Sequence, residues 1–295
     1  MPKLVADLDA LCSLGETRIR SFLQYLSYGY ATKTPDIALQ PIVAIGNGLI
    51  AVPCLLYLSS NYERNLLGLQ ARIDRKTFDS MSKLFEVDMV HDLLETIRPR
   101  WPHAKGNLTL RAEGGFEEID LLIADPSSHT ILVCELRWML QPGDPREVQN
   151  RKSACREKVG QLARKLQWLH ARTQLVLDAL GVAIGAVEWH MAGVVVIKTF
   201  GGTLSNDTKL PIMPERTFVQ GMQNASSLRH FAEWSQSLCW LPQESEHFRV
   251  VPQEMPLGAL GKRLVAFGME KLCPLRTYVE YVERSLTAPG REHSG

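Results

Sequence analysis

The chain has 295 residues, 45% of them hydrophobic, and its 33 Lys and Arg residues nearly balance 32 Asp and Glu residues, for a formal net charge of +1. This length and composition suffice for one substantial hydrophobic core and a smaller second module. The six cysteines are scattered without a C-x-x-C pair, which argues against a zinc site and a disulfide scaffold and favours a reducing compartment.

The first residues are not expected to form a targeting signal. The sequence M-P-K-L-V-A-D-L-D places acids where a signal peptide needs an apolar run. The longest apolar stretch, residues 41–58, is interrupted by Gly46-Asn47-Gly48 and by Pro53, which favours a β-hairpin over a membrane span. We therefore expect a cytoplasmic protein with no membrane partner.

Residues 1–75 are expected to form an N-terminal module. Residues 4–30 have the pattern of one or two amphipathic helices, and the hairpin is followed by a helix around residues 60–73. A connection from Ile73 to Thr77 then leads into the next helix. This module carries no motif with an obvious chemistry.

A helix over residues 77–97 opens the central part of the chain. One stripe of this helix is apolar, and Arg98-Pro99 ends it. The stripe consists of Phe78, Met81, Phe85, Met89, Leu93 and Ile97. Glu86 lies beside the stripe. A first strand over Leu108–Glu113 follows, and Gly114-Gly115 form a turn into the next strand.

Carboxylates stand inside the next two apolar strands, which read E-I-D-L-L-I-A and L-V-C-E-L-R. Asp125-Pro126-Ser127-Ser128 is a turn signal between them. If Ser127-Ser128 is a two-residue loop, Asp120 lies opposite Glu135 and Glu118 lies opposite Arg137. Since side chains alternate along a strand, all four charged groups then share one sheet face.

Two interpretations of this cluster are open. Cβ atoms of directly opposed residues lie roughly 4.5–5.5 Å apart, so two carboxylates there repel unless a cation such as Mg²⁺ or Mn²⁺ lies between them. Alternatively, Glu118 and Arg137 form a salt bridge and Asp120 is solvated at a sheet edge. The pairing register of the two strands decides between these interpretations, because a slip of one residue would move the charged side chains apart.

The segment resembles the core of the PD-(D/E)xK nuclease superfamily, which has the restriction-endonuclease-like fold. Asp120 matches the family's Asp and Glu135 matches the acidic member of (D/E)-x-K, whereas Arg137 stands in place of the lysine. The resemblance covers residues 77–200. It implies a metal site of Asp120, Glu135 and Glu86 that binds Mg²⁺ or Mn²⁺, and it makes Lys158 the candidate substitute for the lysine.

The helix that follows, from Glu147 to Arg172, carries a basic stripe beside an apolar one. The apolar stripe contains Val148, Cys155, Val159, Leu162, Leu166 and Leu169, and the basic residues Arg151, Lys158, Lys165 and Arg172 recur every seven positions. Segregated positive charge beside a carboxylate cluster suits a phosphodiester backbone, although a solvated helix face is the alternative. Related nucleases carry Gln or Lys in this helix, which implies a catalytic role for Gln161 and Lys158.

A buried strand over residues 189–200 completes the order helix, three strands, helix, strand, which is the minimal core of the resembled fold. We expect an α/β core of a central mixed sheet flanked by helices over residues 76–200. Residues 201–295 form a C-terminal extension with helices around 226–240 and 274–286 and a disordered tail from Thr287. Gly258–Lys262 does not fit a phosphate-binding loop, because its glycines are too close together and Arg263 replaces the Ser or Thr.

The first hypothesis is a metal-dependent endonuclease or exonuclease that hydrolyses DNA. Asp120 and Glu135 would bind the metal, and Arg137 or Lys158 would contact the scissile phosphate. The basic residues Arg151, Lys158, Lys165 and Arg172 would bind the DNA backbone without reading sequence. RNA is an open alternative substrate, and a second copy of the chain or other protein subunits are further candidate partners.

Two other hypotheses compete with the nuclease. The first is a catalytically inactive nuclease fold that binds nucleic acid or serves as a scaffold subunit of a larger assembly, for example in phage defence or a mobile element. The Arg137 substitution favours it, and the presence of both Asp120 and Glu135 opposes it. The second is a protein-interaction module in which the hairpin charges form structural salt bridges.

Overall fold

A computed structural model describes residues 2–143, 145–183, 187–198, 209–256, 263–271, 273 and 275–287. The chain divides into two compact units, residues 1–85 and 86–295. The boundary between the two units lies inside a helix, and the second unit includes most of the expected core together with the C-terminal extension. Within the described ranges, no helix combines the length and apolar character needed to cross a bilayer.

The first unit is a small helical module with one hairpin. Its elements are α1 (Pro2–Cys12), α2 (Glu16–Tyr25), β1 (Val43–Gly46), β2 (Leu49–Ala51), α3 (Cys54–Ser59) and α4 (Tyr62–Ile73). The hairpin is confirmed, since β1 and β2 pair antiparallel across Asn47-Gly48, where both residues have positive φ. Apolar side chains from α1, α2 and α4 form the core of this unit.

Helix α5 (Arg75–Ile97) begins earlier than the sequence predicts. The Asp74 carboxylate accepts hydrogen bonds from the backbone nitrogen of Thr77 at 3.1 Å and from its hydroxyl at 2.6 Å. This contact caps the helix start. The expected connection from Ile73 to Thr77 is therefore wrong, because α4 ends at Ile73 and a single residue separates the two helices.

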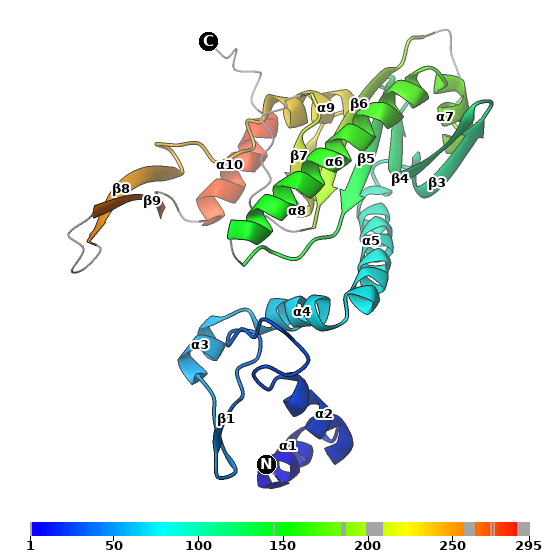
Figure 1. The fold of residues 1–295 in the computed structure, drawn as a ribbon. Coiled ribbons are helices and arrows are strands. Elements are labelled where there is room, and N and C mark those ends of the chain that lie inside the picture. The colour runs from blue at the N-terminus through cyan, green and yellow to red at the C-terminus, as the bar shows by residue number, and fades with distance from the viewer. Residues whose placement is uncertain are drawn as a thin grey trace. The chain divides into compact units, whose positions relative to one another are not determined.

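The second unit is built on a five-stranded mixed sheet, in which the strands lie side by side in chain order (Figure 1). The strands are β3 (Ala104–Ala112), β4 (Gly115–Asp125), β5 (Thr130–Arg137), β6 (His190–Ile197) and β7 (Ile212–Pro214). Strands β3, β4 and β5 are antiparallel, whereas β5, β6 and β7 run parallel. The predicted order of helix, three strands, helix and strand is present, with additional elements.

Helices cover both faces of this sheet. The first apolar cluster joins α5 with α8 (Glu215–Asn224), α9 (Leu228–Ser237) and α10 (Leu275–Thr287), and we call it the α5-side core. The second joins α6 (Pro145–His170) and α7 (Thr173–Leu180) to the opposite face, and we call it the α6-side core. The expected central mixed sheet flanked by helices is confirmed.

A glycine lets α6 lie close to the sheet. A Cβ atom added to Gly193 of β6 would lie 2.7 Å from Cδ1 of Leu166 and 3.1 Å from Cδ2 of Leu162, both on α6. Atoms that close must shift, so a larger residue would displace these leucine side chains or the helix that carries them. Gly193 thereby allows β6 to lie close to the helix that carries Arg151, Lys158 and Lys165.

The C-terminal part differs from expectation in several elements. Helix α9 is shorter than the predicted helix over 226–240, and α7 and α8 were not predicted. An antiparallel hairpin of β8 (Phe248–Pro256) and β9 (Arg263–Lys271) was not predicted either. The residues after Thr287, the Gly201-Gly202 break and the Gly258–Lys262 segment lie outside the described residues.

Candidate functional site

The candidate site lies where β4 and β5 separate. The two strands pair from Asp125 and Thr130 to Leu121 and Cys134, which is the register that the sequence predicts. The loop is longer than expected, since four residues and not two lie between the paired ends. The paired region ends immediately before Asp120 and Glu135.

At this point a side-chain hydrogen bond replaces the backbone hydrogen bonds between β4 and β5. Oδ2 of Asp120 accepts a hydrogen bond of 2.8 Å from the backbone nitrogen of Leu136. The carbonyl of Arg137 faces the other way, because it accepts from the backbone nitrogen of Lys198 at 3.2 Å, beyond the end of β6. Since backbone polar groups alternate in direction along a strand, the Leu136 carbonyl faces the same opening as Asp120.

The alternation of β4 side chains changes at Asp120. Ile119 belongs to the α6-side core, but Leu121 belongs to the α5-side core, although residues two apart in a regular strand share a face. Asn107, on the neighbouring strand between the pairs Gly106–Leu121 and Leu108–Ile119, has a φ of 50°. The local irregularity turns Asp120 toward the α6 side of the sheet.

The same irregularity separates Glu118 from the cluster. Glu118 is exposed and lies opposite Thr109 of β3, away from the opening between β4 and β5. Arg137 pairs instead with Glu86 of α5, with Nη1 and Oε1 3.0 Å apart. The expectation that all four charges share one face, with Glu118 opposite Arg137, is therefore wrong.

Glu135 is the centre of the site. Its side chain is 0% exposed, and each of its oxygens meets an ammonium group from α6. Oε2 lies 3.0 Å from Nζ of Lys158, and Oε1 is paired with Nζ of Lys165. Lys158 also lies 3.6 Å from Oδ2 of Asp120. The negative charges of two carboxylates are thus offset by the positive charges of two ammonium groups inside the site.

The surrounding charges change the pKa of two groups. Burial by itself lowers the pKa of Lys158, but the carboxylates of Asp120, Glu135 and Glu86 outweigh it and raise the pKa above its usual value. Burial raises the pKa of the Cys134 thiol well above its usual value, and the same Asp120 and Glu135 charges add to the effect. Lys158 is thus a stable cation, and Cys134 is a neutral core residue.

The remaining predicted residues lie along α6 and beyond its end. Gln161 is half-buried between Lys158 and Lys165 in sequence, on the same side of the helix. Arg151 is buried and donates from Nη1 to the Leu140 carbonyl at 2.9 Å. Arg172 lies past the end of α6, with its guanidinium 4.4 Å from the ring centre of Trp168.

The basic stripe therefore lies mainly against the protein. Arg151 and Lys165 are buried, and Lys158 and Arg172 are half-buried. Arg172 donates to the Glu113 carbonyl at 3.3 Å, which ties the region after α6 to the β3–β4 turn. The structure brings Asp120, Glu135, Lys158 and Lys165 together, and places Arg151 and Arg172 in separate contacts.

One charged pair near the site was not anticipated. Glu117 of β4 is buried and forms an ion pair with Arg164 of α6, whose side chain is 61% exposed. The sequence offered a weak signal, since β4 has carboxylates at Glu117, Glu118 and Asp120, and any of them could face the core. In a regular strand, Glu117 and Asp120 would point to opposite faces of the sheet. Both face α6 because the alternation of side chains changes at Asp120.

The donor atoms suit a divalent cation in type. Two carboxylates and the Leu136 carbonyl surround the opening, and hard oxygen donors are what Mg²⁺ and Mn²⁺ prefer. No group of three or more His, Cys, Asp or Glu side chains with metal-binding spacing occurs in the part of the chain that the structure describes. The Lys158 ammonium group contacts both carboxylates, so a metal ion has to displace it.

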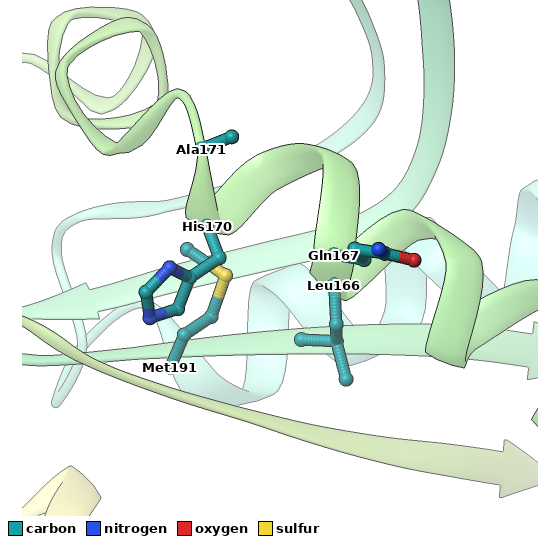
Figure 2. Close-up of a pocket in the computed structure, with 5 residues that line it drawn as sticks. All are labelled: Leu166, Gln167, His170, Ala171 and Met191. Atoms are coloured by element: carbon teal, nitrogen blue, oxygen red, sulfur yellow. The ribbon is translucent and has the colours of Figure 1, made fainter.

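An open hollow elsewhere on the second unit is distinct from this site. Leu166, Gln167 and His170 line it from the end of α6, together with Ala171 just after the helix and Met191 of β6, which lies next to His170 (Figure 2). Met191 pairs with Ile131, near the start of β5, whereas Glu135 pairs with Val195. Four residues of strand, about 13 Å, separate the two places. The hollow is mainly apolar, and none of the five described residues that line it is a carboxylate.

Comparisons of the chain with family models, with curated proteins and with solved structures found no match. The function therefore has to be inferred from the geometry of the site itself.

Proposed function

We propose that the chain is a metal-dependent nuclease of the PD-(D/E)xK type that hydrolyses phosphodiester bonds in DNA. The observation that carries the proposal is the position of Lys158, whose Nζ atom lies 3.0 Å from Glu135 and 3.6 Å from Asp120. Asp120, Glu135 and Lys158 form an acid–acid–lysine set at the opening between two strands. The lysine comes from α6, and Arg137 is not needed in its place.

The fold supports the proposal in its order of elements. Helix α5, the antiparallel strands β3 to β5, helix α6 and the parallel strand β6 follow the order of the restriction-endonuclease-like core. The two carboxylates stand on the second and third strands of that order, as in the family pattern. Glu86 on α5 is near enough to raise the pKa of Lys158, which suits the acidic helix residue of the family.

Each residue has a distinct role in the proposed reaction. Asp120, Glu135 and the Leu136 carbonyl would hold one Mg²⁺ or Mn²⁺, which when bound stabilises negative charge on phosphate and acidifies water. Lys158, displaced from the carboxylates, would donate to a phosphate oxygen and stabilise the charge that develops there. Arg137, with 44% of its side chain exposed, would position the neighbouring phosphate while Glu86 holds it.

DNA would contact the exposed cations nearest this opening. Arg156 on α6 is exposed, and Arg164 presents most of its side chain to solvent. Phosphate contacts from such residues supply affinity that falls with salt and carries no sequence information. The buried Lys165 and Arg151 are less suited to that role than the sequence pattern indicates.

A second candidate function is a nuclease fold that binds nucleic acid without cutting it. The observation that favours it is that both oxygens of Glu135 already meet ammonium groups. If the Lys158 contact never opens, the site stays closed to metal and the chain acts as a binding or scaffold subunit. Such a subunit binds DNA equally well with Mg²⁺ and with a chelator at matched ionic strength.

The deciding experiment is cleavage of supercoiled and linear DNA with Mg²⁺, Mn²⁺ or EDTA. Wild type, Asp120→Asn and the exposed control Lys152→Met are compared at equal concentration. Metal-dependent nicking by wild type and by the control, but not by Asp120→Asn, supports the nuclease. No nicking by wild type, with DNA binding that does not depend on metal, favours the binding subunit.

A further inference from the structure

We infer that Lys165 is a positioning residue that holds one oxygen of Glu135 and thereby limits the site to a single divalent cation. This inference rests on the proposed function and gives Lys165 a role other than contact with DNA. It also assigns different roles to the two lysines that form ion pairs with Glu135. Lys165 is the fixed partner, and Lys158 is the partner that a cation can replace.

Burial distinguishes the two lysines. The Lys165 side chain is 9% exposed and its partner carboxylate is 0% exposed, whereas 17% of the Lys158 side chain is exposed. If the Lys165 contact opened, an ammonium group would remain buried without its charge partner, which is strongly unfavourable. Lys158 can turn toward solvent at lower cost, because it lies nearer the surface and has a flexible stem.

The spacing on α6 gives each lysine its own oxygen. Seven residues are about two helical turns, so both side chains leave the same face of α6, on either side of Glu135. Lys158 takes Oε2 and reaches Asp120, whose side chain is 29% exposed. Lys165 takes Oε1 on the other side. The opening at Asp120 is therefore adjacent to Lys158, and Lys165 lies behind Glu135.

The number of protein oxygens that remain available as ligands sets the number of metal ions that the site can bind. Oδ2 of Asp120 accepts from Leu136, Oε1 of Glu135 is held by Lys165, and Oε1 of Glu86 pairs with Arg137. After Lys158 leaves, Oδ1 of Asp120, Oε2 of Glu135 and the Leu136 carbonyl would be the oxygens available to a metal ion. Mg²⁺ and Mn²⁺ complete six ligands with water, so three protein oxygens suit one ion. Two ions would need a carboxylate with both oxygens available.

The test is calorimetric titration of Mn²⁺ into the full chain without DNA. Wild type is compared with Lys165→Met, which keeps the length of the side chain and removes its charge. Glu135 retains Lys158 in this variant, so the buried carboxylate is not left without a partner. Lys165→Arg restores a charged donor, and Lys152→Met removes an exposed charge from the same helix.

We expect one Mn²⁺ per wild-type chain. Lys165→Met should bind Mn²⁺ at least about tenfold more tightly, because a positive charge next to the ligand is lost and Oε1 becomes available. Lys165→Arg and Lys152→Met should keep the wild-type affinity within about threefold. A purely structural Lys165 predicts the opposite for Lys165→Met, with lower thermal stability and unchanged or weaker Mn²⁺ binding.

The outcomes separate the inference from the proposed function. If wild type binds no Mn²⁺, the proposed function fails and the inference fails with it. Two ions bound to wild type overturn the inference alone, and so does an unchanged affinity in folded Lys165→Met. The count of ions needs only wild type, so the inference stays falsifiable even if Lys165→Met does not fold.

Discussion

The Nζ atom of Lys158 lies 3.0 Å from Oε2 of Glu135, although the two residues are 23 positions apart and stand on a helix and a strand. The contact brings a positive charge to the place where the PD-(D/E)xK pattern expects one. Arg137, two residues after Glu135, is instead held by Glu86 on the other side of the strand end. Under the proposed function, the cation next to the two carboxylates is Lys158, whereas the residue at the lysine position of the resembled motif is Arg137.

The first prediction concerns Lys158→Met. The change removes the ammonium group that would stabilise charge on the phosphate, and removal of one such donor costs about 100-fold in rate. Nicking of supercoiled DNA with Mn²⁺ should therefore fall by about that factor. Lys152→Met on the same helix is the matched control, because Lys152 is exposed, and it should keep the wild-type rate within about threefold. Equal rates for wild type and Lys158→Met would remove Lys158 from the reaction.

The sequence predicted the strands of the site and their register. Apolar runs with a turn between them define β4 and β5, and Asp120 and Glu135 do come to the same place. The hydrophobic periodicity of α6 also places Lys158 and Lys165 on one face, since they are two turns apart. These parts were predictable because each depends on local spacing along one element.

Contacts between elements were not predictable in the same way. Periodicity gives the positions of the basic residues on α6 but not the depth at which each one lies, so Lys165 was expected to contact DNA, whereas the structure buries it against Glu135. The change of side at Asp120 lies next to Asn107 of the neighbouring strand, which has a positive φ. Such a backbone irregularity cannot be read from the pattern of polar and apolar residues in the sequence of β4. For this reason the sequence wrongly placed Glu118 on the same face as Asp120.

The second prediction separates stability from chemistry at the two carboxylates. Glu135→Ala leaves two ammonium groups without the buried carboxylate that pairs with both, and loss of one partner of a buried ion pair costs about 3–5 kcal/mol. Asp120→Asn keeps an oxygen that can accept from Leu136, so it should cost less than about 1 kcal/mol. Urea unfolding followed by circular dichroism measures both. Equal stability of the two variants would contradict the central position of Glu135.

The third prediction concerns Arg137 and Glu86. Both side chains are partly exposed, and ion pairs of this kind contribute about 0–1 kcal/mol to the free energy of unfolding. A double-mutant cycle with Arg137→Ala and Glu86→Ala should give a coupling energy in that range. In the cleavage assay, Arg137→Ala should reduce the rate less than Lys158→Met. A larger loss for Arg137→Ala would make Arg137, and not Lys158, the cation of the site.

The fourth prediction concerns acid stability and Asp125. Burial by itself raises the pKa of this carboxyl group, but hydrogen bonds from Leu228, Ser127 and Ser128 outweigh it and hold the pKa below its usual value of 3.8. A lowered pKa in the folded state stabilises the protein fully above the usual value, and this contribution disappears as the pH falls through the folded pKa. Asp125→Asn should therefore remove part of the stability loss below about pH 4.

The measurement is urea unfolding of wild type and Asp125→Asn between pH 7 and pH 3. Oδ2 of Asp125 accepts from the backbone nitrogen of Leu228 at 3.0 Å, which joins the β4–β5 turn to the start of α9. Asp125→Asn should thus lose about 1–3 kcal/mol at pH 7, and its difference from wild type should shrink toward pH 3. A difference that stays constant with pH would contradict the assignment.

The fifth prediction compares Gly193, which faces α6 from β6, with Gly160 on the exposed side of α6. A Cβ atom at Gly193 would meet Leu166 at 2.7 Å, so Gly193→Ala should force α6 away from β6 and destabilise the protein by about 1–3 kcal/mol. Gly160 lies within α6, is exposed, and has nothing within 4 Å of its own Cβ position. Gly160→Ala should stabilise the protein by about 0.5–1 kcal/mol through the better helix propensity of alanine.

These two variants also test whether the position of α6 matters for the site. Lys158 and Lys165 both reach Glu135 from this helix, so a shift caused by Gly193→Ala changes both contacts at once. Cleavage should fall in Gly193→Ala at temperatures where the variant is still folded, whereas Gly160→Ala should cleave at the wild-type rate. If folded Gly193→Ala cleaves normally, the site does not depend on the close approach of α6, and the lysines reach Glu135 through the flexibility of their own side chains.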